Sequence, residues 1–149
     1  MGERPLIARV LGLDVGQRRV GVSLSDALGL TAQRLTLIER QTLEHDLHTI
    51  AMLVEEHGVK VIVVGLPLTM QGVIGEQAKL VMAFVEALRR VVPCPVQVID
   101  ERLTTVQGER SLLATETSRR KRKRLIDQVA AQLILQAYLE TRHDVHPAR

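Results

Sequence analysis

One short segment limits the folds open to this chain. Residues Val59–Leu66 (VKVIVVGL) are nearly all apolar, with Lys60 as the only charge, and Pro67 follows directly. Eight residues is a usual length for a strand and short for a helix, and an apolar run without alternation is typical of a strand covered on both faces. The segment therefore predicts a buried strand in a sheet that helices cover.

The rest of the chain alternates between strand-like and helix-like patterns. The first three strands should form an antiparallel meander, and the later strands, separated by helices, should pair in parallel. The predicted fold class is α/β, with a five-stranded mixed sheet flanked by helices. Strands are expected at 7–14, 20–25, 30–38, 59–66 and 96–100, with a hairpin turn at 17–19, and helices at 43–54 (ended by Gly58), 76–90, 103–115 and 125–141.

Composition excludes several classes of protein. The 149 residues suit one domain spanning 1–149, with a loose tail from about residue 143. The chain has no tryptophan, one phenylalanine and one tyrosine, too few aromatics for a platform that stacks single-stranded bases. The single Cys94 excludes an internal disulfide and a cysteine zinc cage. Because no run is apolar enough to span a bilayer or to form a signal peptide, we expect a cytoplasmic protein without membrane association.

Acidic residues occur at the predicted ends of several elements. Asp14 follows the first strand, Asp100 and Glu101 follow the last, and Asp127 lies near the start of the final helix, on its apolar side. A buried carboxylate is costly unless something compensates it, and sites in open α/β sheets form at the carboxyl ends of parallel strands. Taken alone, Asp14 could be a turn residue before Gly16, Asp127 could be a helix N-cap, and the other two could simply end a strand.

Carboxylates that converge on one place repel one another, and a divalent cation removes the conflict. Their oxygens suit Mg²⁺ or Mn²⁺, whereas no cysteine or histidine cluster competes for zinc. Such an ion commonly completes its shell with phosphate oxygens, and two ions can activate a water and stabilise the leaving oxygen in phosphodiester cleavage. The pattern therefore predicts metal-dependent chemistry on phosphodiesters.

Positive charge is concentrated in one run near the C-terminus. The net charge is only +3, yet residues 118–124 (SRRKRKR) hold six consecutive cations. Such a run is either a solvated, partly disordered loop or a contact for a polyanion, and its place directly before Asp127 favours the contact. Phosphate contacts are sequence-independent and salt-dependent, so we expect recognition of structured nucleic acid by shape. The six cations are Arg119, Arg120, Lys121, Arg122, Lys123 and Arg124.

The ordered set of segments in this chain resembles the YqgF (RuvX) family. The segments are GLDVGQRRVGVSLSD, VVGLPLTMQG, DERLTT, SRRKRKR and IDQVAAQLIL, and together they extend over residues 9–139. The resemblance implies a ribonuclease H-like fold related to RuvC Holliday junction resolvases. It implies a nuclease that matures the 5′ end of pre-16S ribosomal RNA, with a pre-ribosomal particle as partner, or alternatively a resolvase of four-way DNA junctions.

The same resemblance assigns roles to individual residues. It implies that Asp14, Glu101 and Asp127 are the catalytic acids and bind Mg²⁺ or Mn²⁺. Asp100 and Glu101 point to opposite faces of a regular strand, and the choice of Glu101 rests on the family match. The predicted nucleic-acid-binding residues are Arg18 and Arg19 in the hairpin, Thr69, Arg102, which could clamp a phosphate or offset the neighbouring acid, and the six cations of residues 119–124.

The loop at residues 69–74 departs from the family pattern. The family usually has an asparagine and then Met-Asp-Gly here, whereas this chain has Thr69, Met70, Gln71 and Gly72, followed by Val73 and Ile74. None of the three acids is altered. The departure therefore leaves the substrate contacts open rather than the metal site.

Two other classes of function remain open from the sequence. An ATPase of the actin and sugar-kinase type has a similar first hairpin, but such enzymes close a cleft between two related domains and this chain has the length of one. A non-catalytic nucleic-acid-binding or ribosome-associated factor could keep the fold without cleaving.

A junction resolvase cuts two strands symmetrically, which favours a homodimer with twofold symmetry.

Overall fold

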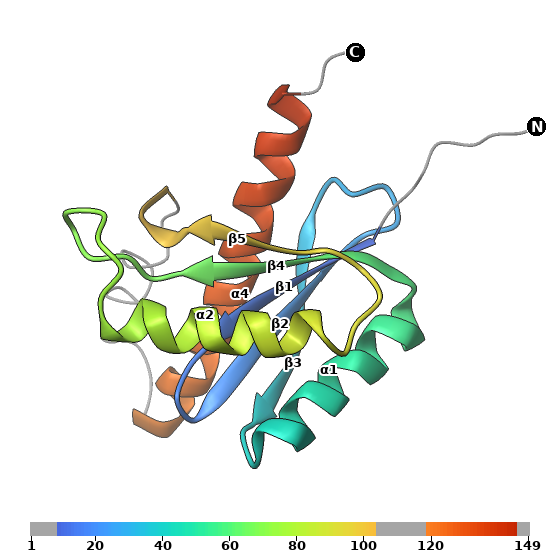
Figure 1. Ribbon diagram of the computed structural model, residues 1–149. Helices are drawn as coiled ribbons and strands as arrows, with labels where there is room; N and C mark the ends of the chain where they lie inside the picture. Colours follow the sequence, from blue (N-terminus) through green and yellow to red (C-terminus); the bar gives the residue numbers. More distant parts are fainter. Residues whose placement is uncertain (1–8, 104–118, 146–149) are drawn as a thin grey trace, which may run out of the picture.

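The computed structural model describes residues 9–103 and 119–145. Its five strands form one sheet in the order β3-β2-β1-β4-β5 (Figure 1). β1, β2 and β3 are antiparallel neighbours, and β1–β4 and β4–β5 pair in parallel. This confirms the predicted mixed sheet. The strands are β1 (Arg9–Val15), β2 (Arg19–Ser25), β3 (Ala32–Glu39), β4 (Val59–Leu66) and β5 (Val96–Asp100).

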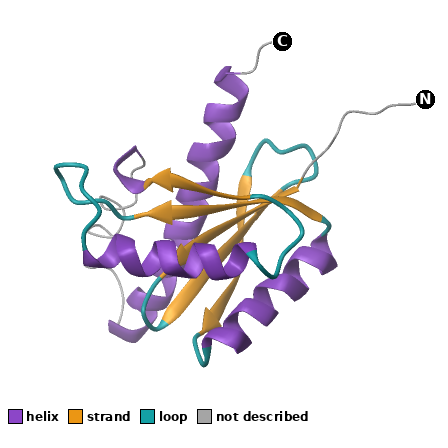
Figure 2. Cartoon of the chain, viewed as in Figure 1, coloured by secondary structure: helices purple, strands orange, loops and turns teal. Residues whose placement is uncertain are grey.

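Helices cover both faces of the sheet. Helices α1 (Leu43–His57) and α2 (Glu76–Arg89) lie on one face, and the long helix α4 (Arg119–Val145) crosses the other (Figures 1 and 2). A short 3₁₀ turn, η1 (Glu101–Leu103), follows β5. The predicted helix at 103–115 falls, beyond Leu103, outside the described residues. Within the described ranges, no helix combines the length and the apolar stretch needed to cross a membrane.

Alternation along the strands divides the core into two layers. In β1, Leu11 and Leu13 belong to the apolar layer under α1 and α2, whereas Val10 packs under α4. In β4, Ile62 lies in the first layer and Val63 in the second, both fully buried. The segment Val59–Leu66 is thus covered on both faces, as its unbroken apolar pattern predicts.

Helices α1 and α2 begin at the predicted residues, Leu43 and Glu76, and α1 ends at the predicted Gly58. The Thr42 side chain caps α1 by accepting a hydrogen bond from the His45 amide, and Gly58 ends it in the left-handed conformation at φ 63°. In α2, Phe84 is buried in the core, whereas Met82 is only partly buried against it. Phe84 lies three residues after Val81, on the same side of the helix.

Helix α4 is longer at both ends than the sequence predicted. It begins at Arg119 instead of 125 and ends at Val145 instead of near 141, three residues into the expected tail. The cationic run is therefore the first part of the helix and not a loop before it. Lysine and arginine are good helix formers, so the charge pattern that indicated a loop did not oppose a helix.

Candidate functional site

Asp14 is a buried acid on the α4 face of the sheet. It lies inside β1, two residues beyond Gly12, and its Cα partner in β2 is Gly21. A side chain built on Gly12 would meet Leu135 of α4, and alternate residues of a strand share a face, so Asp14 faces α4 as well. The turn begins only at Gly16, so Asp14 is not a turn residue.

Asp127 approaches Asp14 through a close contact between α4 and β2. A Cβ added at Gly21 would overlap the main-chain carbonyl of Asp127, so only glycine permits this packing. Gly21 is paired with Asp14, which places the two acids next to the same residue. Asp127 lies inside α4 and is therefore not a helix N-cap.

Glu101 is buried on the same face, at the far side of β4. Its Oε2 lies 2.9 Å from where a Cβ on Gly65 would stand, beside the Ile134 side chain of α4. Glu101 therefore lies on the α4 face, directly after β5, and its predicted role as a metal ligand stays a prediction. Glycine at position 65 leaves room for its carboxylate.

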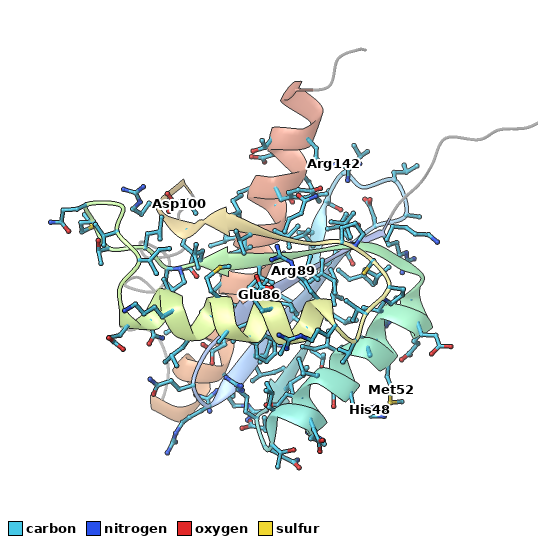
Figure 3. All side chains as sticks on the ribbon, in the orientation of Figure 1. His48, Met52, Glu86, Arg89, Asp100 and Arg142 are labelled. Carbon is cyan, nitrogen blue, oxygen red and sulfur yellow. The ribbon has the colours of Figure 1, made fainter. Side chains whose placement is uncertain are left out.

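Asp100 is occupied by a different contact. Arg102 donates from Nε and Nη2 to the Asp100 carboxylate, at distances of 2.7–3.2 Å. The Arg102 guanidinium lowers the pKa of Asp100 below its usual range. Figure 3 shows Asp100 at the end of β5, near the edge of the sheet. Arg102 thus offsets Asp100 and not Glu101.

Arg102 and Thr69 together hold the loop that follows β4. Arg102 Nη1 donates to the Met70 carbonyl at 3.2 Å, and the Thr69 hydroxyl accepts from the Val73 amide at 3.1 Å. Gly72 takes a positive φ of 80° in the same loop. The structure therefore gives both residues contacts that shape the loop, while their predicted contacts with nucleic acid stay predictions.

Arg19 forms an ion pair with Asp127. Its Nε lies 2.9 Å from Asp127 Oδ2, and the pair lies in a hollow of about 350 Å³. We call this hollow the Asp127 pocket. Arg18 is exposed at the tip of the hairpin beside it. The lining residues are Gly16, Gln17, Arg18, Arg19, Ile126 and Asp127.

The three acids fit a divalent cation in their chemistry but not yet in their arrangement. Carboxylate oxygens are the donors that Mg²⁺ and Mn²⁺ prefer. In the described part of the chain, however, no group of three or more acid, histidine or cysteine side chains is arranged to hold a metal ion. Arg19 holds Asp127 Oδ2, so that oxygen can bind a metal ion only if the ion pair separates.

The cationic residues at the start of α4 directly precede Asp127 on the same helix. Arg124 is exposed, pairs with Glu39 of β3, and precedes Asp127 by three residues, so the two lie on one side of the helix. The backbone of residues 119–123 is helical, and their side chains are not described. The predicted contact of this run with a polyanion stays a prediction.

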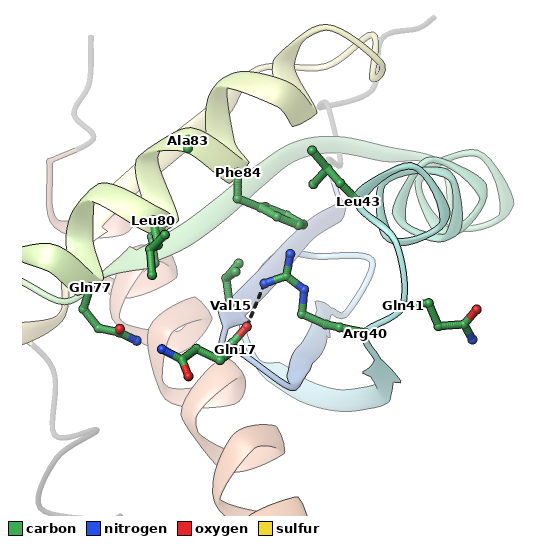
Figure 4. A pocket seen from close by; sticks show the side chains of 11 residues that line it. Val15, Gln17, Arg40, Gln41, Leu43, Gln77, Leu80, Ala83 and Phe84 are labelled. Carbon is green, nitrogen blue, oxygen red and sulfur yellow. Dashed lines mark hydrogen bonds between the residues drawn. The ribbon is translucent and has the colours of Figure 1, made fainter.

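A further arginine–aspartate pair, on the opposite face of the sheet, was missed from the sequence. Arg40 donates from Nε to Asp46 at 3.0 Å and from Nη1 to the Gly16 carbonyl at 2.8 Å, and its guanidinium lies 5.1 Å from the Phe84 ring centre. Arg40, Gly16 and Phe84 border a hollow of about 530 Å³, the Phe84 pocket (Figure 4). The available signal was Phe84, the one phenylalanine, on the inward side of α2.

Asp46 is fully buried and charged. Burial opposes its ionisation, but hydrogen bonds from the Gln41 amide and the Arg40 guanidinium outweigh that cost, so the pKa of Asp46 lies below its ordinary value. The His45 ring nitrogen adds a contact at 3.4 Å. This acid therefore holds the connection between β3 and α1 in place.

Comparison with known sequences finds close relatives over most of the chain. The RuvX family model, described as Holliday junction resolvase, matches residues 8–141. A protein of Moorella thermoacetica is 52% identical over 132 residues, 89% of this chain and 94% of the relative. One of Halothermothrix orenii is 46% identical over 138 residues, 93% and 99% of the two chains. Both relatives are named as proposed pre-16S rRNA nucleases.

Comparison with solved structures identifies the fold. RuvC of Thermus thermophilus in complex with a Holliday junction substrate aligns with a TM-score of 0.58 at 12% identity, over 93% of this chain and 97% of that one. The fowlpox virus resolvase with Holliday junction DNA aligns with a TM-score of 0.53 at 12% identity, over 89% and 97%. At such identities the likeness concerns the fold alone, and it confirms the ribonuclease H-like architecture that the sequence resemblance implied.

Proposed function

Because the chain belongs to the RuvX family, we propose that it is a nuclease that hydrolyses phosphodiester bonds in structured nucleic acid. The observation that carries the proposal is the pair of buried carboxylates on the α4 face of the sheet, Asp14 inside β1 and Glu101 in the turn directly after β5. The main chain of Asp127 packs against Gly21, the strand partner of Asp14, and the cationic first part of α4 precedes Asp127. Buried titratable groups are more frequent at functional sites than elsewhere in proteins.

The proposed cofactor is Mg²⁺ or Mn²⁺, held by Asp14, Glu101 and Asp127. When bound, such an ion polarises a phosphoryl oxygen and lowers the pKa of a coordinated water. Before both oxygens of Asp127 can bind the ion, Arg19 has to release the Asp127 carboxylate. The Arg19 guanidinium, once free, is positioned to pair with a phosphate of the strand, and Arg18 at the hairpin tip offers a second cation.

The proposed substrate is the 5′ region of pre-16S ribosomal RNA, cleaved in the cytoplasm, with a pre-ribosomal particle as the partner. The names of the relatives that are 46% and 52% identical support it. We further propose that one ribonuclease H-like domain carries the whole site. The alternative is a Holliday junction resolvase acting as a twofold dimer, which the family description and the junction-bound structures of the same fold favour.

A cleavage assay with two substrates tests this proposal. Purified protein with Mn²⁺ or Mg²⁺ is given a labelled 5′ fragment of pre-16S RNA or a mobile four-way DNA junction. Asp14→Asn and Asp127→Asn are compared with wild type, and Glu86→Gln serves as a control. Glu86 is an exposed acid paired with Arg89 on α2, which lies on the opposite face of the sheet from α4 (Figures 1 and 3).

We expect the RNA to be cut by wild type and by Glu86→Gln. Cleavage should fall about a thousandfold or more in Asp14→Asn, since losing a metal ligand removes several kilocalories per mole of transition-state stabilisation. Paired cuts across the junction would select the resolvase instead. Binding of either substrate without any cut would favour the non-catalytic factor and overturn the nuclease proposal.

A further inference from the structure

The Phe84 pocket lies on the far side of the first hairpin from the acids. Helices α1 and α2 and the end of β1 enclose it, whereas α4 lies on the other face of the sheet (Figures 1 and 4). The turn residues Gly16 and Gln17 line both this pocket and the Asp127 pocket. One hairpin thus separates two hollows, and a chain of nucleotides that passes over it borders both.

The walls of the Phe84 pocket combine apolar surface with uncharged hydrogen-bonding groups. Phe84 and Val81 are buried in its wall, while Leu43 and Leu80 are largely exposed at its rim. Exposed leucines beside a pocket gain by being covered with an apolar ring face. A volume of about 530 Å³ falls in the range of small-molecule sites.

Three glutamines supply the polar part of the lining. Gln17, Gln41 and Gln77 are exposed at the pocket, and Gln17 and Gln77 point toward one another in Figure 4. Each amide offers both a donor and an acceptor. Amides of this kind complement the edge of a nucleobase, which presents donors and acceptors in one plane.

The charge of the pocket argues against an anion as its ligand. Arg40 is the one cation among its lining residues, and Asp46 already neutralises it. Its guanidinium is further fixed by the Gly16 carbonyl and by the Phe84 ring. A flat, uncharged, polar ring matches these walls better than a phosphate or a carboxylate does.

We propose that the Phe84 pocket binds a single nucleobase, between the leucines of its rim and with its edge at Gln17 and Gln77. The base belongs either to a nucleotide turned out of the bound strand, in which case the inference rests on the proposed nuclease function, or to a free mononucleotide. A strand nucleotide placed there leaves its phosphate next to Arg18 and Arg19, at the entrance of the Asp127 pocket.

Two binding measurements test this inference without using cleavage. In the first, wild-type protein is titrated with a nucleoside monophosphate and with ribose 5-phosphate, which lacks the base. In the second, Asp14→Asn protein is titrated with a short single strand and with copies that carry one abasic nucleotide at each position in turn. Both are repeated with Ala83→Phe, which fills the pocket mouth from an exposed position, and with Gln77→Ala. Gln97→Ala, an exposed amide outside the pocket, is the control.

For a base from the strand, we expect one abasic position to weaken binding about tenfold or more, because the apolar contacts and the hydrogen bonds of the base are lost. That difference should vanish in Ala83→Phe, shrink in Gln77→Ala and persist in Gln97→Ala. For a free mononucleotide, the nucleoside monophosphate should bind and ribose 5-phosphate should not, with the same ranking of variants.

The inference is overturned if neither the monophosphate nor any abasic position reveals dependence on a base, or if Ala83→Phe binds like wild type. A strand that binds without any dependence on a base would remove the pocket and leave the nuclease proposal standing. If the protein binds the monophosphate but cleaves no nucleic acid, the pocket proposal stands and the nuclease proposal fails. The two proposals can therefore fail separately.

Discussion

Two arginine–aspartate pairs flank the first hairpin, and they differ in almost everything except their chemistry. Arg40–Asp46 stands on the α1 and α2 face with a fully buried acid, and Arg19–Asp127 stands on the α4 face with side chains that are 15% and 24% exposed. Asp46 accepts from a guanidinium and a main-chain amide, and its arginine also binds a carbonyl and covers a ring. Asp127 is held by Arg19 Nε at the wall of an open hollow.

This contrast separates a fixed ion pair from a releasable one. Breaking a buried pair leaves an uncompensated charge, whereas a partly exposed pair can exchange its partner for water, a cation or a phosphate at little cost. The account therefore assigns Arg40–Asp46 to the support of the fold and Arg19–Asp127 to the site.

The largest expected effect is on stability. Asp46→Asn should lower the free energy of unfolding by about 2–3 kcal/mol, because it removes charged hydrogen bonds inside the protein. Asp127→Asn should cost about 1 kcal/mol or less. Urea unfolding of both variants beside wild type measures the difference. Equal losses for the two would show that the contrast between the pairs is not energetic.

The pH dependence sharpens the same contrast. The folded pKa of Asp46 lies below the ordinary 3.8, so its ionised form contributes stability above that pH and loses it as the pH falls through the folded value. The difference in unfolding free energy between wild type and Asp46→Asn should therefore be full at neutral pH and shrink on acidification below about 3.8. Urea unfolding at several pH values tests this, and a gap that widens in acid would contradict it.

The smallest expected effect concerns arginine replaced by lysine. Arg40 uses two nitrogens and the flat face of its guanidinium, so Arg40→Lys should cost about 1–2 kcal/mol. Arg19 reaches Asp127 through Nε alone, and Arg19→Lys should change stability by about 0.5 kcal/mol at most. Thermal unfolding of the two variants compares them directly. A larger loss for Arg19→Lys would reverse the assignment of the two pairs.

Local patterns predicted the sheet because they report local physics. The apolar run of β4 and the Gly58 that ends α1 act within a few residues, and the structure has them at the predicted positions. Side chains alternate along a strand, and Asp100 and Glu101 accordingly have different surroundings: Asp100 pairs with Arg102, and Glu101 lies on the α4 face. The start of α4 was misplaced, because six like charges suggest a solvated loop while the same residues favour a helix.

The ion pair that holds Asp127 joins two distant parts of the chain, so no local sequence pattern could predict it. Arg19 and Asp127 are 108 residues apart, and their pairing follows from the approach of α4 to Gly21. The sequence identified Asp127 as an inward acid but could not show that an arginine occupies it. The Phe84 pocket was missed for the same reason, since three separate segments line it.

A titration with Mn²⁺ tests most directly whether Asp127 exchanges Arg19 for a metal ion. Wild type is compared with Arg19→Gln, Asp127→Asn and Arg124→Gln. The last variant removes the same charge one helical turn away, from a residue paired with Glu39 instead. We predict that Arg19→Gln binds Mn²⁺ about fivefold more tightly, as the loss of about 1 kcal/mol of competition requires. Asp127→Asn should bind it more weakly, and Arg124→Gln should change little at physiological salt. Equal Mn²⁺ affinity in wild type, Arg19→Gln and Asp127→Asn would contradict the account.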